Sequence, residues 1–400
     1  MKQALQGIKV VDLTTTIAGP LAFRTLADYG ADVIKIESPD GDPTRSTGPR
    51  KVPRLGAVFI QLNRNKRSVS VNLKSSAGKE VIRRLIADAD VFGHNMRPSA
   101  LARLGLGYDA CRTINPKIIH AGIVGYGRDG RNRDAAAYDD LIQAASGVTD
   151  LVATATQGSP GYTPLNLADR LAGLTAVHAV LAALIHRGRT GEGQSIEIPM
   201  FETVVEFLMG DHMWGATFDQ SPASMGYSRA LSPNRGPYQT SDGYIAVLPY
   251  INKHWHALYR LLGKDDYITD PRFATTAGRF QNMDLLLETT LQGGLRGKTT
   301  AEWTELMRAA DIPCGTVNRL GDLLTDPHLQ DVGLFQTYTH PTEGELTVPR
   351  PPVWMSETPP QIRTQPSLLG EDNADVLHEL GFTDAEIDQM RADGVLYSAS

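Results

Sequence analysis

The chain has 400 residues, more than one hydrophobic core normally holds, so two domains are expected. Its 39 Lys and Arg against 45 Asp and Glu give a net charge of −6 without long runs of one sign, which argues against nucleic acid as a partner. Cys111 and Cys314 lie far apart without metal-ligand spacing, which favours a reducing compartment. The N-terminus lacks a signal-peptide pattern and the longest apolar run is too short to span a bilayer. We therefore expect a cytoplasmic protein with no membrane partner.

The first two hundred residues alternate between strand and helix patterns. Residues 8–13 are apolar and β-branched, residues 20–29 form a helical stretch that Gly30 ends, and residues 32–37 are typical of a second strand. The same alternation continues with a strand at 68–73, a helix at 78–89, and strands at 91–93 and 118–124. This order predicts an α/β fold with a mostly parallel sheet covered by helices on both faces.

A long helix is predicted at 171–187, with Asp169 at its head. Apolar residues occur on nearly every side of this helix, so we expect it to be buried. The stretch GRTGEGQ then turns the chain into a strand at 195–198. An aspartate at a helix N-terminus is kept ionised by the helix dipole and can act as a nucleophile. The structural alternative for Asp169 is an N-cap.

Beyond residue 220 the composition changes. Residues 221–236 are rich in Ser, Pro, Gly, Asn and Arg, which indicates a domain boundary, and residues 238–248 are typical of a hairpin. Residues 255–307 are predicted to be helical and charged. The Pro-rich residues 349–360 contain Trp354, which predicts an extended, docked segment before a helical tail at 372–394.

One basic segment, NRNKRSVSVNLK at 63–74, can be read in two ways. It is either a solvated loop or a phosphate site, because Arg and Lys pair with phosphate oxygens. The histidines have no paired metal-ligand spacing, so no metal is expected.

Several separated sequence motifs occur in a fixed order along nearly the whole chain: VVDLTTTIAGP, NRNKRS, GYG, NLAD, RTGEGQ, PYQTSDGYI and SLLGEDNADVLHELG. In these motifs the chain resembles the family III CoA-transferases, which include formyl-CoA and carnitine CoA-transferases and the related acyl-CoA racemases. The resemblance implies a Rossmann-like large domain, a smaller α+β domain and an interlocked homodimer. The large domain would contain residues 1–220, the small domain residues 221–325, and residues 326–400 would cross over and return to the large domain.

The resemblance also implies a site and its substrates. Asp169 would be the catalytic nucleophile, and the substrates would be an acyl-CoA and a small carboxylic acid, with coenzyme A as the carrier. Backbone N–H groups of Ile17 and Ala18 would face the thioester oxygen, and Tyr138 would face the acyl group. The full set implied to bind CoA is Ile17, Ala18, Arg67, Asn72, Leu73, Lys74, Asn95, Met96, Arg97, Arg103 and Tyr138.

Departures from the family pattern limit the reactions that this chain is expected to catalyse. Formyl-CoA transferases have glutamine in place of Ile17, arginine in place of Ser38, and a glycine-rich loop in place of residues 248–253, so formyl transfer is disfavoured. Racemases have histidine in place of Tyr138, and a phenol is a weak base at neutral pH. Acyl-CoA racemisation remains the alternative, because it would also use Asp169.

Two other classes of protein share parts of this sequence pattern. A nicotinamide-dependent oxidoreductase fits the opening strand–helix–strand, but TTTIAGP follows the first strand where G-x-G-x-x-G is expected. A CoA-binding regulatory protein without activity remains open.

Overall fold

The computed structural model describes residues 2–398 and divides into two compact units. Unit 1 contains the chain up to residue 146, residues 164–205 and the chain from residue 328 onward. Unit 2 contains residues 147–163 and 206–327. The sequence assigned residues 147–163 and 206–220 to the first domain, whereas the structure groups them with unit 2. The chain re-enters unit 1 at residue 328, close to residue 326, where the sequence predicted that it crosses back to the large domain.

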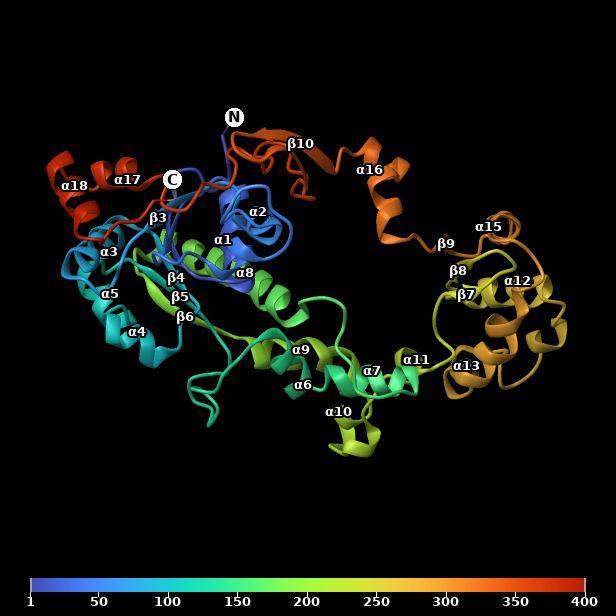
Figure 1. Ribbon diagram of the computed structural model, residues 1–400. Coiled ribbons are helices and arrows are strands. Elements are labelled where there is room, and N and C mark those ends of the chain that lie inside the picture. The colour runs from blue at the N-terminus through green and yellow to red at the C-terminus, as the bar shows by residue number, and fades with distance from the viewer. Residues whose placement is uncertain (1, 399–400) are drawn as a thin grey trace. The chain divides into compact units, whose positions relative to one another are not determined.

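Unit 1 is built on a six-stranded parallel sheet in the order β3-β2-β1-β4-β5-β6 (Figure 1). The strands are β1 (Lys9–Leu13), β2 (Asp32–Glu37), β3 (Lys66–Ser70), β4 (Val91–His94), β5 (Ile119–Val124) and β6 (Gln194–Pro199). The chain winds outward in one direction from β1 to β3 and in the other from β4 to β6. In open sheets of this kind, ligands bind beyond the carboxyl ends of the strands at the point of reversal, here between β1 and β4. The α/β prediction is confirmed.

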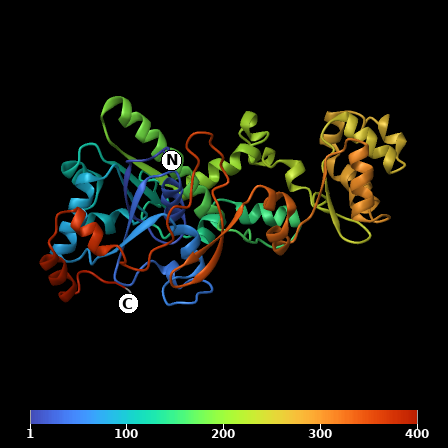
Figure 2. The same cartoon turned by 90° about the horizontal axis from the view of Figure 1, so that it is seen from above.

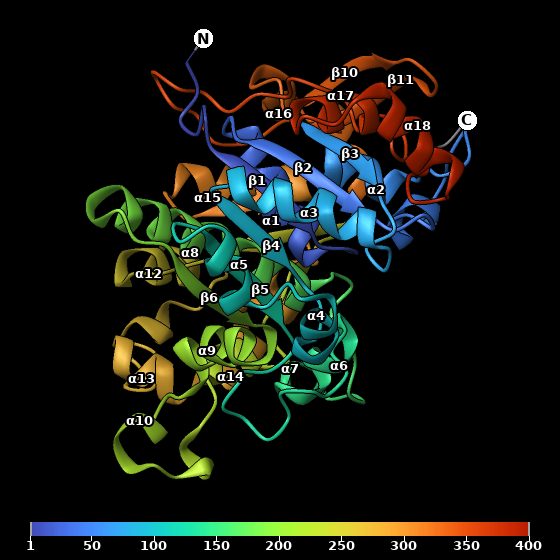
Figure 3. The same cartoon turned by 90° about the vertical axis from the view of Figure 1, so that its left-hand side faces the viewer.

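Helices cover both faces of this sheet. On one face lie α1 (Ala18–Asp28) and α8 (Leu167–Thr190), which pack on each other and on the strands. The opposite face carries α3 (Ser76–Asp88) and α5 (Tyr108–Ile114), in front of the sheet in Figure 3. Side chains alternate along a strand, so Val11 and Ile34 face the α3 side and enter one apolar cluster with the C-terminal helices. These are α17 (Asn373–Glu379) and α18 (Asp384–Ala392), red beside the blue N-terminal strands in Figure 2.

The remaining elements of unit 1 are short. They include the hairpin β10 (Phe335–His340) and β11 (Gly344–Pro349), and the helices α2 (Ala57–Asn63), α4 (Pro98–Leu104), α6 (Asp139–Ala145) and α16 (Pro327–Asp331), with α9 (Met200–His212) leading into unit 2. Residues 350–360 form neither helix nor strand, as their proline content predicts. Trp354 is 80% exposed, so the expected docking of this segment through Trp354 is not made within the chain.

Unit 2 is a small α+β domain with its own apolar core around Trp255, Tyr259 and Trp303. Its antiparallel sheet has the order β7-β8-β9. The strands are β7 (Tyr238–Gln239), β8 (Tyr244–Val247) and β9 (Cys314–Thr316), and the helices are α7 (Val148–Thr156), α10 (Ala216–Asp219), α11 (Ser228–Leu231), α12 (Asn252–Leu261), α13 (Thr276–Gln281), α14 (Met283–Leu287) and α15 (Thr300–Ala309). The expected hairpin and the smaller α+β domain are confirmed.

Helix α8 differs from expectation in its burial. It packs on α1, β5 and β6 along one side only, and Leu174 and Ile185 on its other side are 52% and 57% exposed. The prediction of a helix buried all round is therefore wrong for the single chain. By length and composition α8 could cross a membrane, a test that the core helix of a soluble protein also passes.

The contact between α8 and α1 depends on the absence of a side chain at Gly173. A Cβ added there would lie 2.6 Å from the carbonyl oxygen of Ala18. Because that oxygen is backbone, the helices would have to separate.

We predict that Gly173→Ala lowers the free energy of unfolding by about 1–3 kcal/mol, since overpacking forces a backbone shift. Gly188 lies in the same helix with nothing within 4 Å of an added Cβ, so Gly188→Ala should be neutral or stabilising by up to about 1 kcal/mol. Urea unfolding of both variants measures the difference. Equal stability of Gly173→Ala and wild type would show that the close approach of Gly173 to Ala18 is not needed for α8 to pack on α1.

Candidate active site

A cleft of about 550 Å³ opens at the carboxyl ends of β1, β4, β5 and β6. Its walls come from the segments that follow these four strands and from the start of α8. The structure brings together six of the residues predicted from the sequence, namely Ala18, Asn95, Met96, Arg97, Tyr138 and Asp169. Segments distant in the sequence therefore meet at the position that the parallel sheet predicts.

Asp169 lies in the first turn of α8 and is not its cap. The N-cap is Asn166, and the backbone N–H of Asp169 donates to Oδ1 of Asp139 at 3.0 Å. In the part of the chain that the structure describes, the Asp169 carboxylate accepts no hydrogen bond. The alternative of a capping role is therefore wrong, and the carboxylate lines the cleft with its oxygens unengaged.

The electrostatics of Asp169 differ from the sequence expectation. Burial and the neighbouring charge of Asp139 raise the pKa of Asp169 to about 6, while Arg170 acts in the opposite direction. The helix N-terminus thus does not hold this pKa low. At pH 7 roughly nine-tenths of the molecules still carry the ionised form, because pH exceeds the pKa by about one unit. The carboxylate is then ionised and more basic than an ordinary aspartate.

The loop between β1 and α1 forms the facing wall. Asn95 holds it through both ends of its amide: Oδ1 accepts from Thr15 N–H at 3.0 Å and Nδ2 donates to Thr15 O at 2.8 Å. Thr16 has a positive φ of 73°, and its N–H lies 3.3 Å from both Asp42 carboxylate oxygens. The amide of Asn95 therefore positions the loop and retains one donor hydrogen and one acceptor lone pair.

Two buried lysines, Lys35 and Lys66, make the hydrogen bonds and ion pairs that hold this loop and the strand before it. Lys35 donates to Thr14 O at 2.8 Å and to Asp42 Oδ2 at 2.9 Å. Lys66 donates to Asp12 Oδ2 at 2.9 Å, and burial lowers the pKa of Lys66 to about 8 while Asp12 opposes the shift. The sequence analysis missed these roles, although a lysine inside the apolar strand DVIKIE was a signal.

The N-terminus of α1 meets the same cleft. Ile17 is the residue before the helix and Ala18 is its first residue, and Ala18 lines the cleft. The first N–H groups of a helix have no intrahelical acceptors, so they are suited to an oxygen that gains negative charge. Only Ala18 of the predicted pair is in the wall.

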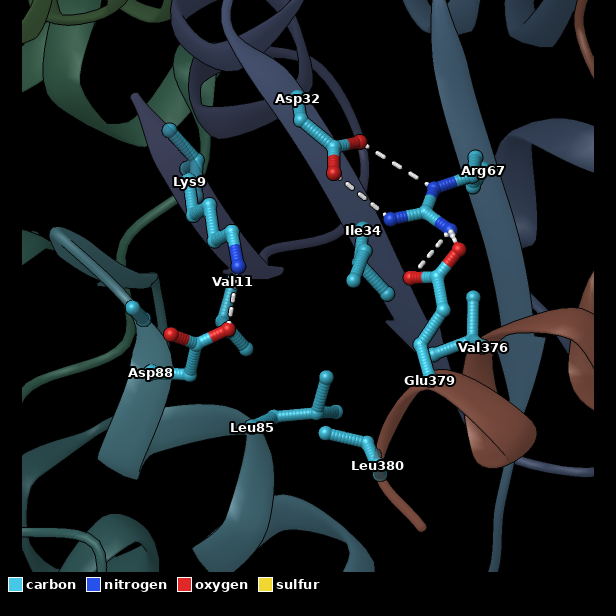
Figure 4. Close-up of a pocket in the computed structure, with 12 residues that line it drawn as sticks. Lys9, Val11, Asp32, Ile34, Arg67, Leu85, Asp88, Val376, Glu379 and Leu380 are labelled. Atoms are coloured by element: carbon cyan, nitrogen blue, oxygen red, sulfur yellow. Dashed lines mark hydrogen bonds and ion pairs between the residues drawn. The ribbon is translucent and has the colours of Figure 1, made fainter. Parts of the chain in front are cut away.

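Besides Ile17, five predicted CoA contacts lie outside this cleft. Arg67 is at the amino ends of the strands, where Nη2 lies 2.6 Å from Asp32 Oδ2 and Nη1 lies 2.8 Å from Glu379 Oε1 (Figure 4). It is thus paired with two carboxylates of its own chain, and Lys66 beside it is buried. Asn72, Leu73 and Lys74 follow β3 at the carboxyl edge, and Arg103 is exposed on α4; none of them lines the cleft. Their contacts with CoA stay predictions.

The cleft also contains residues that the sequence analysis did not select. Arg133 joins Arg97 in its wall, and both side chains are exposed. Arg133 Nε lies 3.2 Å from Asp134 Oδ2, so Arg97 is the less engaged of the two cations and the more favourable position for an anionic group of a ligand. Within residues 2–398 no group of three His, Cys, Asp or Glu side chains is arranged to hold a metal ion.

Comparison with known proteins decides the family. Residues 5–373 match the model of CoA-transferase family III. The chain belongs to this family. It is 32% identical to the succinyl-CoA:glutarate CoA-transferase of Mus musculus, over 98% of this chain and 90% of the relative. It is also 32% identical to the formyl-CoA:oxalate CoA-transferase of Streptomyces avermitilis, over 99% of this chain and all of the relative.

A solved structure agrees with this assignment. The crystal structure of a CAIB/BAIF family protein from Brucella suis aligns with a TM-score of 0.79 at 32% identity, covering 95% of this chain and 100% of that one. The resemblance seen in the sequence is confirmed, and the protein is an enzyme of CoA-transferase family III, whose members use acyl-CoA as substrate.

The raised pKa of Asp169 generates a pH prediction. Activity that needs the ionised carboxylate should fall as pH drops through about 6. Asp139→Asn removes a charge that raises this pKa yet retains an oxygen for the Asp169 N–H, so the acidic limb of the kcat/KM profile should move to lower pH. Asp140→Asn, at the exposed neighbour, should leave the profile in place. An unmoved limb in Asp139→Asn would contradict the electrostatic assignment.

Proposed function

We propose that this enzyme moves CoA from an acyl-CoA to a free carboxylic acid through Asp169. A carboxylate oxygen of Asp169 attacks the thioester carbonyl carbon, the C–S bond breaks, and a mixed anhydride and CoA thiolate result. The thiolate next attacks the aspartyl carbonyl of this anhydride, which releases the donor acid and leaves an aspartyl-CoA thioester. The acceptor carboxylate attacks the carbonyl of that thioester, the C–S bond breaks, and a second mixed anhydride and CoA thiolate result. The thiolate finally attacks the acceptor's acyl carbonyl, which gives the new acyl-CoA and restores the Asp169 carboxylate. No net energy source is needed, because one thioester replaces another.

The unengaged carboxylate of Asp169 carries this proposal. Its pKa of about 6 combines an ionised state at neutral pH with raised basicity, which suits a nucleophile. Ala18 begins α1 in the same wall, so helix N–H groups are available to the thioester oxygen as charge develops. Arg97 and Arg133 can pair with phosphoryl groups of CoA.

The relatives support a small acid as acceptor. They are named for succinyl-CoA with glutarate and for formyl-CoA with oxalate. Ile17 and residues 248–253 differ from the formyl-CoA pattern, so we propose a small carboxylic acid other than oxalate, with a dicarboxylate such as succinate as the first to test.

The racemase alternative gains no support from the cleft. Proton removal next to a thioester needs a base on each face, and no histidine is among the described residues lining this cleft. Deuterium incorporation at the α-carbon of a branched acyl-CoA, without acceptor acid, is the measurement that would favour it.

We also propose a homodimer in the cytoplasm. Leu174 and Ile185 lie on the same side of α8 and are each more than half exposed, and apolar side chains grouped on one surface commonly mark interfaces. Both cysteines are free thiols, which suits a reducing compartment. Light scattering on the purified protein tests the dimer directly.

Asp169→Asn tests the proposed chemistry. It should reduce CoA exchange at least about 1,000-fold, because the shape is kept and the nucleophile is lost. CoA binding should persist, and the melting temperature at pH 7.5 should not fall. The pKa of Asp169 is higher in the folded state than in the unfolded state, so at pH 7.5 the ionised carboxylate lowers the stability of the fold. An asparagine carries no charge and removes this cost.

Two further measurements accompany the variant. Hydroxylamine added during turnover should convert Asp169 of the wild type, but no other aspartate, to a hydroxamate detectable by peptide mass. Asp140→Asn is the matched control and should keep wild-type exchange. Wild-type exchange by Asp169→Asn would refute the proposal.

A further inference from the structure

Lys66, from the basic segment 63–74, contacts the first turn of α1 with its buried ammonium. It is 3% exposed, and its Nζ donates to Asp12 Oδ2 at 2.9 Å, to Pro20 O at 3.0 Å and to Asn63 Oδ1 at 2.9 Å. An ammonium has three N–H groups, so each of them has an acceptor. The acceptors come from β1, from α1 and from the end of α2. Lys66 therefore joins the elements on both sides of the loop at residues 14–17.

This loop presents backbone to the Asp169 cleft. Asp12 Oδ1 accepts from the N–H of Thr14 at 2.9 Å and also from its hydroxyl. One carboxylate thus connects the ammonium of Lys66 to the first residue of the loop. Thr15, Thr16 and Ala18 follow and line the cleft, whereas Lys66 does not. A shift at Lys66 would therefore displace the groups that the cleft presents, without touching a ligand.

The charge of Lys66 is close to its titration point near neutral pH. Burial lowers the pKa of Lys66 to about 8, Asp12 and Asp42 oppose this shift, and Lys35 adds to it. Lys35 lies in the same network but behaves differently. Burial acts to lower its pKa too, yet Asp42 and Asp12 outweigh burial there, so the pKa of Lys35 is raised. As pH rises, Lys66 is the first of these two lysines to lose its proton.

A neutral Lys66 cannot keep all its bonds. The amine has two N–H groups for three acceptors, so one of Asp12, Pro20 and Asn63 loses its donor. The buried charge of Asp12 then has less compensation, which is costly. The contacts that fix the loop weaken together.

We propose that Lys66 is a positioning residue for the reaction at Asp169, and that loss of its proton sets the alkaline limit of activity. The ammonium holds the β1–α1 loop so that the first N–H groups of α1 remain directed at the thioester oxygen. Removing one well-placed donor from such an oxygen typically costs about 100- to 1,000-fold in kcat. This inference rests on the function proposed for the Asp169 cleft.

The test is the pH profile of kcat for CoA exchange at saturating substrates. In the wild type, kcat should fall above pH 8 by about tenfold for each pH unit, as the ammonium is lost. Lys66→Arg stays charged over this range, so its alkaline fall should disappear while KM for acyl-CoA changes little. Lys35→Arg is the matched control in the same network and should keep the wild-type alkaline limb.

A second variant keeps the size of the buried side chains. Asn63→Asp is isosteric and places a carboxylate where Oδ1 now lies 2.9 Å from Nζ. The added negative charge should raise the pKa of Lys66 and move the alkaline limb to higher pH. A residue that only stabilised the fold would change kcat equally at every pH.

Hydrogen exchange gives a third measurement, on the wild type itself. After correction for intrinsic exchange, the protection of the peptide covering residues 13–20 should fall above pH 8, because the loop loosens. The peptide covering α15 is the control and should keep its protection.

The outcomes separate this inference from the chemistry at Asp169. An alkaline limb that stays in place in both Lys66→Arg and Asn63→Asp would overturn it, as would unchanged protection of residues 13–20 or an equal displacement of the limb in Lys35→Arg. Asp169→Asn should lose exchange at every pH. Exchange that survived in Asp169→Asn with its alkaline limb intact would refute the nucleophile and leave the role of Lys66 standing.

Discussion

The Asp169 cleft depends on a set of buried ion pairs beneath the β1–α1 loop. Lys35 joins Asp42 to the carbonyl of Thr14, and Lys66 joins Asp12 to the carbonyl of Pro20. Buried charges are costly unless fully paired, and removing one partner typically costs about 3–5 kcal/mol. The network therefore permits one loop geometry and penalises others. A strained residue such as Thr16 persists only because its surroundings determine its conformation.

Burial, which makes this network rigid, also raises the pKa of Asp169. Burial and the charge of Asp139 both disfavour the ionised carboxylate, so its pKa rises to about 6. An ordinary stable helix start would place a carboxylate where backbone N–H groups satisfy it. Asn166 has the cap position instead, and Asp169 lies within the first turn of α8, with unengaged oxygens. Stability is thus given up at Asp169, a pattern that is common at functional sites and agrees with the proposed role of this residue.

Local sequence patterns predicted the strands and helices. They did not predict contacts between residues that lie far apart in the sequence. The strand at 32–37 agrees with β2 and the strand at 118–124 with β5, because periodicity acts over a few residues. Arg67 was selected for its charge, yet its partners Asp32 and Glu379 are distant in sequence, and no local pattern reveals them. The role of Asp139 beside Asp169 was missed for the same reason. The family resemblance placed Asp169, Asn95 and Tyr138 together, which spacing alone could not do.

The lining of the Asp169 cleft contains charges of both signs. In the proposed reaction the acyl-CoA, the carboxylic acid and the Asp169 carboxylate are all anions. Arg97 lines the same cleft and offsets part of the repulsion, whereas Arg133 is already paired with Asp134. A pKa near 6 means that the Asp169 carboxylate exchanges readily with its neutral form.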